Sequence, residues 1–269
     1  VFPMVSVGAT ENAIMAAVLA KGSSELVNSA REPEISDLAD CLNAMGAKIS
    51  GHGTDTIMIE GVTSLCGATH RVVADRIEAG TFAIAAGITG GSLTLKQARP
   101  RHLDALIDVL RLSGIDVREV DDDLIVTATD RVLATDISTD PFPGFPTDLQ
   151  AQFMAMMCVA DGSSRISETI FENRFMHVPE LVRMGADISV DGGVAFVRGR
   201  RQLTSAPVMA TDLRASVSLV LAALATEGES EVSRIYHLDR GYSKLEEKLG
   251  QCGARLERIN DGKEDDDVS

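Results

Sequence analysis

The sequence contains no tryptophan, only two tyrosines, and only four cysteines in 269 residues. The cysteines are Cys41, Cys66, Cys158 and Cys252. They form no Cys-x-x-Cys pair and have no histidine at metal-ligand spacing, which disfavours a zinc site or a disulfide framework. Three of them fall in helical patterns, where we expect small core side chains. We therefore expect no bound metal.

The chain also has fewer basic than acidic residues, 25 compared with 40, and its net charge is −15. This balance disfavours nucleic-acid binding through a broad basic surface. The longest apolar run, Val217 to Ala225, is too short to cross a bilayer, and no signal-peptide pattern opens the chain. We expect a cytoplasmic protein with no membrane or nucleic-acid partner, which must hold any anionic ligand locally.

Several motifs of common enzyme classes are missing. The chain has no Walker motif, no G-x-G-x-x-G fingerprint and no nucleophile elbow. Their absence disfavours nucleoside-triphosphate hydrolysis, dinucleotide binding and hydrolase-type serine catalysis. The histidines are not clustered, and we expect His177 and His237 to act as hydrogen-bonding spacers.

What the chain does contain is an internal repeat marked by glycine. Four glycines follow a helical pattern and precede a strand pattern, at spacings of 68, 71 and 68 residues. They are Gly46, Gly114, Gly185 and Gly253. A second set lies 23 to 25 residues earlier and comprises Gly22, Gly91, Gly162 and Gly228. Glycine suits a helix end that needs positive φ, so the pattern predicts four stacked α-β-α-β-β units.

A short loop with arginine recurs between the first strand and the second helix of each unit. Nineteen of the 25 basic residues are arginine, whose guanidinium can grip phosphate or carboxylate in a bidentate manner. The loop arginines are Arg31, Arg99, Arg101, Arg174 and Arg240. The repeat predicts that they share one rim of the molecule. The alternative is local pairing with acids, as Arg31 could pair with Glu32 or Glu34.

A Thr-Asp-Leu turn opens the first helix of two units, at Thr147-Asp148-Leu149 and at 211–213. Thr147 and Gln150 fit a capping box, which would leave the Asp148 carboxylate available to a ligand as a candidate base. The alternative is that each acid only complements its helix dipole.

The segment Val5-Ser6-Val7-Gly8 is expected to be a strand that runs into a helix through Gly8. Backbone N–H groups at such a turn can bind phosphate. The alternative role for Ser6 is a simple helix cap.

Together, seven long segments resemble the UDP-N-acetylglucosamine 1-carboxyvinyltransferase family of enolpyruvyl transferases, and the resemblance runs from Val5 to about Ile259. The segments include Asp75-Arg-Ile-Glu-Ala-Gly-Thr-Phe82, Phe145-Pro-Thr-Asp-Leu-Gln-Ala-Gln-Phe153 and Glu168-Thr-Ile-Phe-Glu-Asn-Arg-Phe-Met-His-Val-Pro-Glu180. The others cover 5–12, 30–34, 209–216 and 234–242.

The resemblance implies an α/β fold of two inside-out barrels, with helices inside and sheets outside. Each barrel has three units, so four of the six units are expected here. Residues 1–73 would be the C-terminal unit of the first barrel domain and residues 74–260 the second barrel domain. Residues 261–269 would be a disordered acidic tail, and the complete protein is expected to be monomeric.

The activity implied by the resemblance is transfer of the enolpyruvyl group from phosphoenolpyruvate to the 3-hydroxyl of UDP-N-acetylglucosamine. It releases phosphate, opens peptidoglycan synthesis and needs no metal or organic cofactor. The family's acid cysteine, in a mobile lid, and its Lys-Asn pair have no counterpart here. We therefore expect this chain alone to be inactive; the alternative is a truncated relative that binds a UDP-sugar or a partner without catalysis.

The resemblance also assigns the site residues. Asp148 would be the general base, Arg240 would clamp phosphoenolpyruvate, and Asp212 would line the same cleft as a further catalytic residue. The implied substrate-binding residues are Val5, Ser6, Val7, Gly8, Ile170, Phe171, Arg174 and Arg214.

Overall fold

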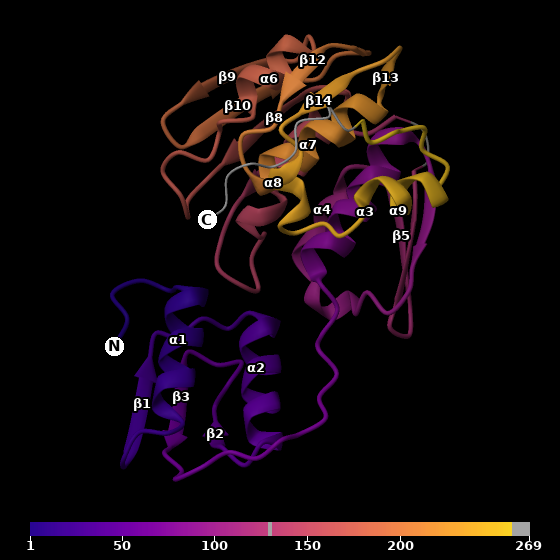
Figure 1. The fold of residues 1–269 in the computed structure, drawn as a ribbon. Helices are drawn as coiled ribbons and strands as arrows, with labels where there is room; N and C mark the ends of the chain where they lie inside the picture. Colours follow the sequence, from indigo (N-terminus) through magenta and orange to yellow (C-terminus); the bar gives the residue numbers. More distant parts are fainter. Residues whose placement is uncertain (129–130, 260–269) are drawn as a thin grey trace.

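The computed structural model describes residues 1–128 and 131–259, which form a smaller N-terminal body and a larger body (Figure 1). Between them, residues 61–75 contain neither helix nor strand. The expected tail at 261–269 lies outside the described residues.

The smaller body is one complete repeat unit. Its elements are α1 (Val7–Ala17), β1 (Ser23–Val27), α2 (Pro33–Ala44), β2 (Lys48–Ser50) and β3 (Thr56–Glu60). The antiparallel sheet has the order β1-β3-β2, and the two helices cover it around buried Ile14, Ile35 and Ile57.

The expected strand at Val5–Val7 is wrong, because α1 already begins at Val7. Ser6 caps this helix: its hydroxyl accepts from Ala9 N at 3.3 Å and its carbonyl from Thr10 N at 3.0 Å. A residue that satisfies the first helical N–H groups fixes the helix start, and no neighbouring strand pairs with this segment.

The larger body begins with two more units of the same order. The first has α3 (Arg76–Thr89), β4 (Ser92–Leu95), α4 (Asp104–Leu112), β5 (Asp116–Val120) and β6 (Asp123–Thr127). The next has β7 (Ile137–Ser138), α5 (Gln150–Met157), β8 (Ser163–Ser167), α6 (Val178–Arg183), β9 (Asp187–Asp191) and β10 (Val194–Arg198). Their sheets run β4-β6-β5 and β7-β8-β10-β9, so the predicted unit recurs with one added edge strand.

The last unit departs from the prediction. It has α7 (Leu213–Leu224), β13 (Thr226–Glu227), β14 (Glu231–Ser233), α8 (Tyr236–Asp239) and α9 (Leu245–Gln251). Its short strands pair in parallel with β11 (Leu203–Thr204) and β12 (Pro207–Met209). The strand expected after Gly253 is absent through Ile259. Arg258 instead holds this segment by side-chain ion pairs to Asp239 and Glu246.

The glycine punctuation is confirmed at every second-helix end, where Gly46, Gly114, Gly185 and Gly253 all have positive φ. In the earlier set, Gly91 is the exception. The left-handed residue there is Gly90, at φ 72°, whose N–H closes α3.

The interior of the larger body is made of helices α3, α5 and α7, which pack against one another inside the sheets. All eight residues of α5 are buried. Gly80 permits this approach, because a Cβ there would lie 2.6 Å from Leu149 Cδ1. Each of these helices opens a repeat unit, so their N-termini gather the turns that carry the candidate site residues.

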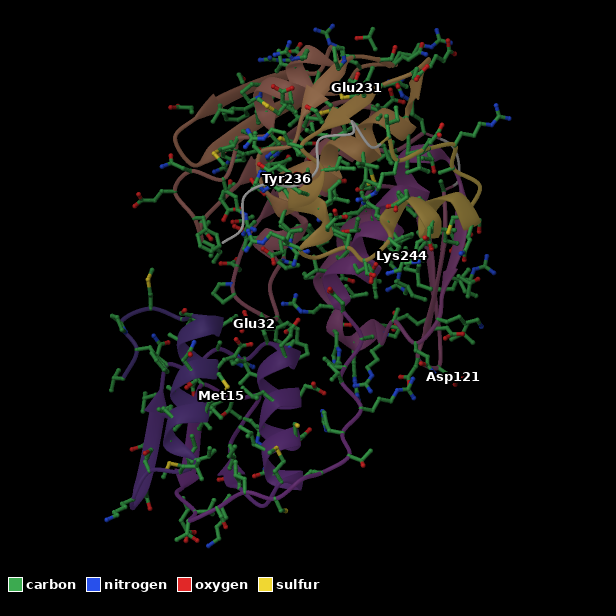
Figure 2. All side chains as sticks on the ribbon, in the orientation of Figure 1. Met15, Glu32, Asp121, Glu231, Tyr236 and Lys244 are labelled. Carbon is green, nitrogen blue, oxygen red and sulfur yellow. The ribbon has the colours of Figure 1, made fainter. Side chains whose placement is uncertain are left out.

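The two bodies have separate hydrophobic cores and meet through polar contacts. Arg76 pairs with Glu34 at 3.0 Å, and Phe142 N donates to Glu32 Oε1 at 3.4 Å. Figure 2 marks Glu32 at the end of α2 that faces the larger body. Within residues 1–128 and 131–259, none of the helices has the length and apolar composition of a membrane span.

The cysteines only partly fit the expectation of core residues. Cys158 is buried, and burial raises the pKa of its thiol to about 12. Cys41 is half-buried, whereas Cys252 is exposed because it follows the last turn of the surface helix α9.

Candidate functional site

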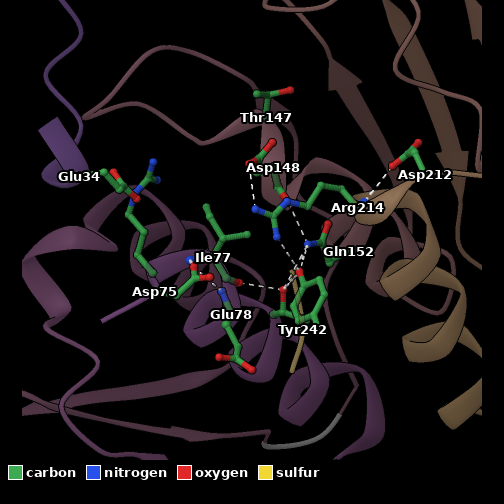
Figure 3. Close-up of polar contacts among 12 residues, drawn as sticks. Glu34, Asp75, Ile77, Glu78, Thr147, Asp148, Gln152, Asp212, Arg214 and Tyr242 are labelled. Carbon is green, nitrogen blue, oxygen red and sulfur yellow. Dashed lines mark hydrogen bonds and ion pairs between the residues drawn. The ribbon is translucent and has the colours of Figure 1, made fainter. Parts of the chain in front are cut away.

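Asp148 lies between two arginines from different units. Its Oδ1 accepts from Arg174 Nη2 at 2.5 Å, and its Oδ2 lies 3.2 Å from Arg214 Nη2. Figure 3 shows the Arg214 side of this cluster. The Asp148 side chain is 36% exposed, so its remaining lone pairs can reach a ligand. A carboxylate held this way can accept a proton or a hydroxyl hydrogen bond.

The predicted capping box at Thr147 is wrong. The Thr147 hydroxyl donates to Glu168 Oε2 at 2.9 Å and accepts from Arg174 Nη1 at 2.8 Å. A single-turn 3₁₀ helix, Thr147–Leu149, precedes α5 and has no side-chain cap. The Thr147 hydroxyl therefore forms hydrogen bonds within the charged cluster and does not cap the helix. The Asp148 carboxylate is still accessible to a ligand, as expected.

Asp212 has a different position from Asp148 despite the shared Thr-Asp-Leu sequence. Its Oδ1 caps α7 by accepting from the backbone N–H of Arg214 at 2.8 Å and of Ala215 at 2.9 Å (Figure 3). Asp75 caps α3 in the same way. Of these three acids, Asp148 alone directs its carboxylate to two guanidinium groups, and Asp212 supports the helix that presents Arg214.

Arg214 is anchored from behind by a buried tyrosine. Its Nη1 donates to the Tyr242 hydroxyl at 3.3 Å, and that hydroxyl also lies 2.9 Å from Thr81 Oγ1 and 3.3 Å from Gln152 Nε2 (Figure 3). Burial raises the pKa of Tyr242. Burial lowers the pKa of Arg214, but Asp148 and Tyr242 outweigh it and raise that pKa overall.

Arg174 is anchored by the loop after β8. Its guanidinium lies 4.8 Å from the centre of the Phe171 ring, which is 54% exposed. The backbone N–H groups of Ile170 and Phe171 both donate to Glu168 Oε1, at 3.0 and 3.1 Å. A ligand at these two residues would therefore meet their side chains and carbonyl groups, since the N–H groups are already used.

Residues Val5 to Gly8 lead into the N-terminus of α1, at the end of the smaller body that faces the larger one (Figure 1). The first N–H groups of a helix have no intrahelical partner and attract anions. A Cβ at Gly8 would meet nothing within 4 Å, so the backbone there is open to a ligand. This geometry suits a phosphate group, although the expected strand is absent.

The local-pairing alternative for Arg31 is wrong. Glu32 accepts from Phe142 N, and Glu34 pairs with Arg76. Among the described residues, Arg31, Arg101 and Arg240 are exposed and have no side-chain hydrogen bond or ion pair. Arg240 therefore does not join the Asp148 cluster directly, yet its guanidinium remains open to an anion.

The expected hydrogen-bonding spacer role of His177 is also wrong, because its ring makes no hydrogen bond to any described residue. The ring is buried and its Nε2 has no hydrogen-bond partner. Burial lowers the pKa of His177 to about 4, against a smaller opposing effect of Asp212. In the part of the chain with assigned structure, no group of three or more His, Cys, Asp or Glu could hold a metal ion.

The candidate site does not coincide with the large surface hollow of the larger body. A surface hollow of about 670 Å³ is lined by residues near the C-terminal ends of the inner helices, among them Gly90, Val159 and Ala225. That end is opposite the N-termini that carry Asp148 and Arg214. The charges that converge on Asp148 are therefore the stronger indication of chemistry.

Sequence reasoning missed Glu168, Gln152 and Tyr242 as parts of the site. All three occur inside the segments quoted above, but nothing in the linear pattern distinguishes them from neighbouring polar residues. Only the packing of α3 and α5 with the segment between α8 and α9 brings Thr81, Gln152 and Tyr242 together.

The family model for EPSP synthase (3-phosphoshikimate 1-carboxyvinyltransferase) matches residues 1–249. The chain belongs to this family. At the sequence level it is 62% identical over 259 residues to a UDP-N-acetylglucosamine 1-carboxyvinyltransferase of Caulobacter vibrioides, covering 96% of this chain and 60% of the relative. A protein of the same name from Gluconacetobacter diazotrophicus is 58% identical over 261 residues, covering 97% and 62%. The resemblance inferred from the sequence is confirmed.

Solved structures support the fold. The enolpyruvyl transferase NikO from Streptomyces tendae superimposes with a TM-score of 0.81 at 28% identity, covering 92% of this chain and 59% of that one. EPSP synthase from Acinetobacter baumannii gives 0.69 at 17% identity, covering 96% and 62%, and shows the fold alone. The chain has the mixed α/β enolpyruvyl transferase fold, and it spans about 60% of the length of the relatives it matches.

Proposed function

We propose that the full-length polypeptide containing these residues transfers the enolpyruvyl group of phosphoenolpyruvate to the 3-hydroxyl of UDP-N-acetylglucosamine. The identity of about 60% to enzymes of that name carries the proposal. The reaction would release phosphate and open peptidoglycan synthesis. In this chain, its chemistry would centre on Asp148.

In the proposed reaction, Asp148 accepts the proton of the sugar hydroxyl while that oxygen adds to the protonated phosphoenolpyruvate. Arg174 and Arg214 hold the carboxylate in place, and their positive charge would also stabilise the anionic groups of the second substrate. Arg240 has an unpaired guanidinium and would bind phosphate or carboxylate in a bidentate manner. Asp212 contributes by capping the helix of Arg214.

The sugar nucleotide would bind across the two bodies. The open N-terminus of α1, at Val5, Ser6, Val7 and Gly8, would receive the diphosphate, and Ile170 with Phe171 would contact the remainder. We further propose that residues 1–73 are the last unit of a first barrel, that residues 74–260 are a second barrel of three units, and that four of six units are present. We also propose that the complete protein is a monomer.

The test is phosphate release by the full-length polypeptide with phosphoenolpyruvate and UDP-N-acetylglucosamine, together with mass analysis of the sugar product. The expected mass increase is that of one enolpyruvyl group. Release of phosphate with shikimate 3-phosphate but not with the UDP-sugar would overturn the proposal. The 269 residues alone should release no phosphate, because they contain the side of the site that carries Asp148 but lack the family's acid cysteine.

A further inference from the structure

Glu168 is a buried carboxylate at the point where three segments meet. It lies immediately after β8, and its side chain receives four hydrogen bonds. Oε1 accepts from Thr139 Oγ1 at 3.0 Å and from the backbone N–H groups of Ile170 and Phe171. Oε2 accepts from Thr147 Oγ1 at 2.9 Å. One side chain therefore joins the segment after β7, the turn before α5 and the loop after β8.

The donor and acceptor roles around Thr147 are set by chemistry. A carboxylate only accepts hydrogen bonds and a guanidinium only donates them. The single proton of the Thr147 hydroxyl must therefore go to Glu168, which turns an oxygen lone pair toward Arg174 Nη1 at 2.8 Å. Glu168 thus sets the polarity of the hydroxyl that anchors Arg174.

Glu168 also acts on the face of the same guanidinium. Phe171, whose ring lies 4.8 Å from the Arg174 guanidinium carbon, has its backbone N–H bound by Glu168. The edge of Arg174 is thus held through Thr147 and its face through Phe171. The second terminal nitrogen, Nη2, donates to Asp148 at 2.5 Å.

We propose that Glu168 is a positioning residue, which couples the loop at Ile170 and Phe171 to the carboxylate of Asp148 through Thr147 and Arg174. The inference rests on the proposed function, in which that loop contacts the sugar nucleotide and Asp148 receives its proton. Glu168 itself touches no reacting atom. Its effect is to keep Arg174 in one orientation, so that the general base and the sugar contact share one rigid support.

The test compares four forms of the full-length protein with wild type: Glu168→Gln, Thr147→Val, the double variant and Glu180→Gln. The last is a matched control, because Glu180 is equally buried and accepts from the backbone N–H of Met209 at 3.0 Å, away from Asp148. The glutamine at 168 keeps an oxygen for the backbone donors but presents N–H groups to Thr147. The valine removes the connecting hydroxyl only.

The first readout is the split between kcat and KM. Glu168→Gln and Thr147→Val should each lower kcat by about 10- to 100-fold, the effect of one hydrogen bond to a charged group. KM for UDP-N-acetylglucosamine should change much less, because the loop stays bonded to residue 168. The double variant should fall little below Thr147→Val alone, since both substitutions interrupt one chain of contacts. Glu180→Gln should retain the wild-type kcat of its folded fraction.

The second readout needs no substrate. In unliganded protein, NMR of the Arg174 side chain should show slow guanidinium rotation in wild type and Glu180→Gln, and fast rotation in Glu168→Gln and Thr147→Val. Equal rotation in all forms would overturn the positioning role even if the enzyme is active. Conversely, a wild type that makes no enolpyruvyl product would contradict the proposed function, and the NMR comparison would still decide the role of Glu168.

Discussion

The hydroxyl of Tyr242 lies 2.9 Å from that of Thr81, although the two residues are 161 positions apart in the chain. Thr81 belongs to α3, and Tyr242 lies between α8 and α9. Gln152 from α5 and Arg214 from α7 reach the same hydroxyl. Each inner helix of the larger body thus contributes one polar side chain to a single buried group, which ties the first and last units together beneath Asp148.

Replacing Tyr242 with phenylalanine should destabilise this chain by about 1–3 kcal/mol, because buried polar groups lose a shared partner. Urea denaturation measures the loss. Tyr236→Phe is the matched control: that hydroxyl is exposed and bonded only to Arg234, so its loss should stay within about 0.5 kcal/mol. Equal losses in the two variants would mean that the buried network contributes no net stability.

Asp148→Asn in the full-length protein should lower turnover by about 100- to 10,000-fold while UDP-N-acetylglucosamine binding changes far less. The amide keeps the shape but cannot accept the hydroxyl proton. Steady-state kinetics and calorimetric binding measure the two effects. Asp187→Asn is a suitable control, because Asp187 also pairs with two arginines, Arg198 and Arg200, on an outer sheet. Turnover within a small factor of wild type for Asp148→Asn would exclude the base role.

Arg240→Lys should impair the use of phosphoenolpyruvate, since an ammonium cannot reproduce the fork of a guanidinium. We expect a higher KM for phosphoenolpyruvate, a lower kcat, or both. The control Arg165→Lys changes an exposed arginine on β8 and should behave as wild type. If both kinetic constants of Arg240→Lys are unchanged, Arg240 does not belong to the site.

His177 should make the fold sensitive to acid. Burial lowers its pKa to about 4 in the folded protein, from an ordinary value of 6.5. Between these two pKa values the unfolded chain binds the proton more tightly than the folded protein does. The contribution of His177 to the free energy of unfolding is therefore fully present above pH 6.5 and is lost as the pH drops toward 4. The loss of unfolding free energy caused by this histidine is about 3 kcal/mol.

The variant His177→Gln removes that titration and should show a flatter decline of unfolding free energy between pH 7 and pH 4.5. His52→Gln, at a more accessible ring paired with Asp40, serves as the control and should follow the wild-type curve. Parallel curves for wild type and His177→Gln would show that His177 contributes nothing to acid sensitivity.

The smaller body should exchange its amide hydrogens faster than the larger one. It has a small core of its own, and Met15 in α1, labelled in Figure 2, has a side chain that is about half exposed, as has Leu19 just after the helix. Few buried apolar contacts mean a low free energy of local opening. Hydrogen exchange with mass spectrometry should therefore show weaker protection before residue 60 than in α3, α5 and α7. Uniform protection would contradict this.

A fragment of about Asp75 to Ile259 should fold cooperatively by itself, since its inner helices α3, α5 and α7 pack against one another. A single unfolding transition by circular dichroism would support this expectation. A fragment without a cooperative transition would show that the smaller body is needed for folding.

The sequence by itself determined the repeat and most of its elements. Positive φ at Gly46, Gly114, Gly185 and Gly253 follows from a local backbone requirement that only glycine meets cheaply, so spacing was enough to place these helix ends. The family could also be identified from the sequence, because long loop segments keep the residue order typical of that family. The predictions were wrong where the local sequence was ambiguous. At Val5–Val7 the β-branched residues favoured a strand, but Ser6 caps a helix that begins at Val7.

Only the tertiary structure decided what the charged side chains do. Asp148 and Asp212 share a Thr-Asp-Leu turn, yet Asp212 caps its helix and Asp148 faces Arg174 and Arg214. The difference comes from partners outside the turn, since Glu168 draws the Thr147 hydroxyl away from the cap, and Arg174 of the same unit and Arg214 of the next supply the guanidinium groups. Such contacts join residues 21 to 161 positions apart, and no local pattern in the sequence specifies them.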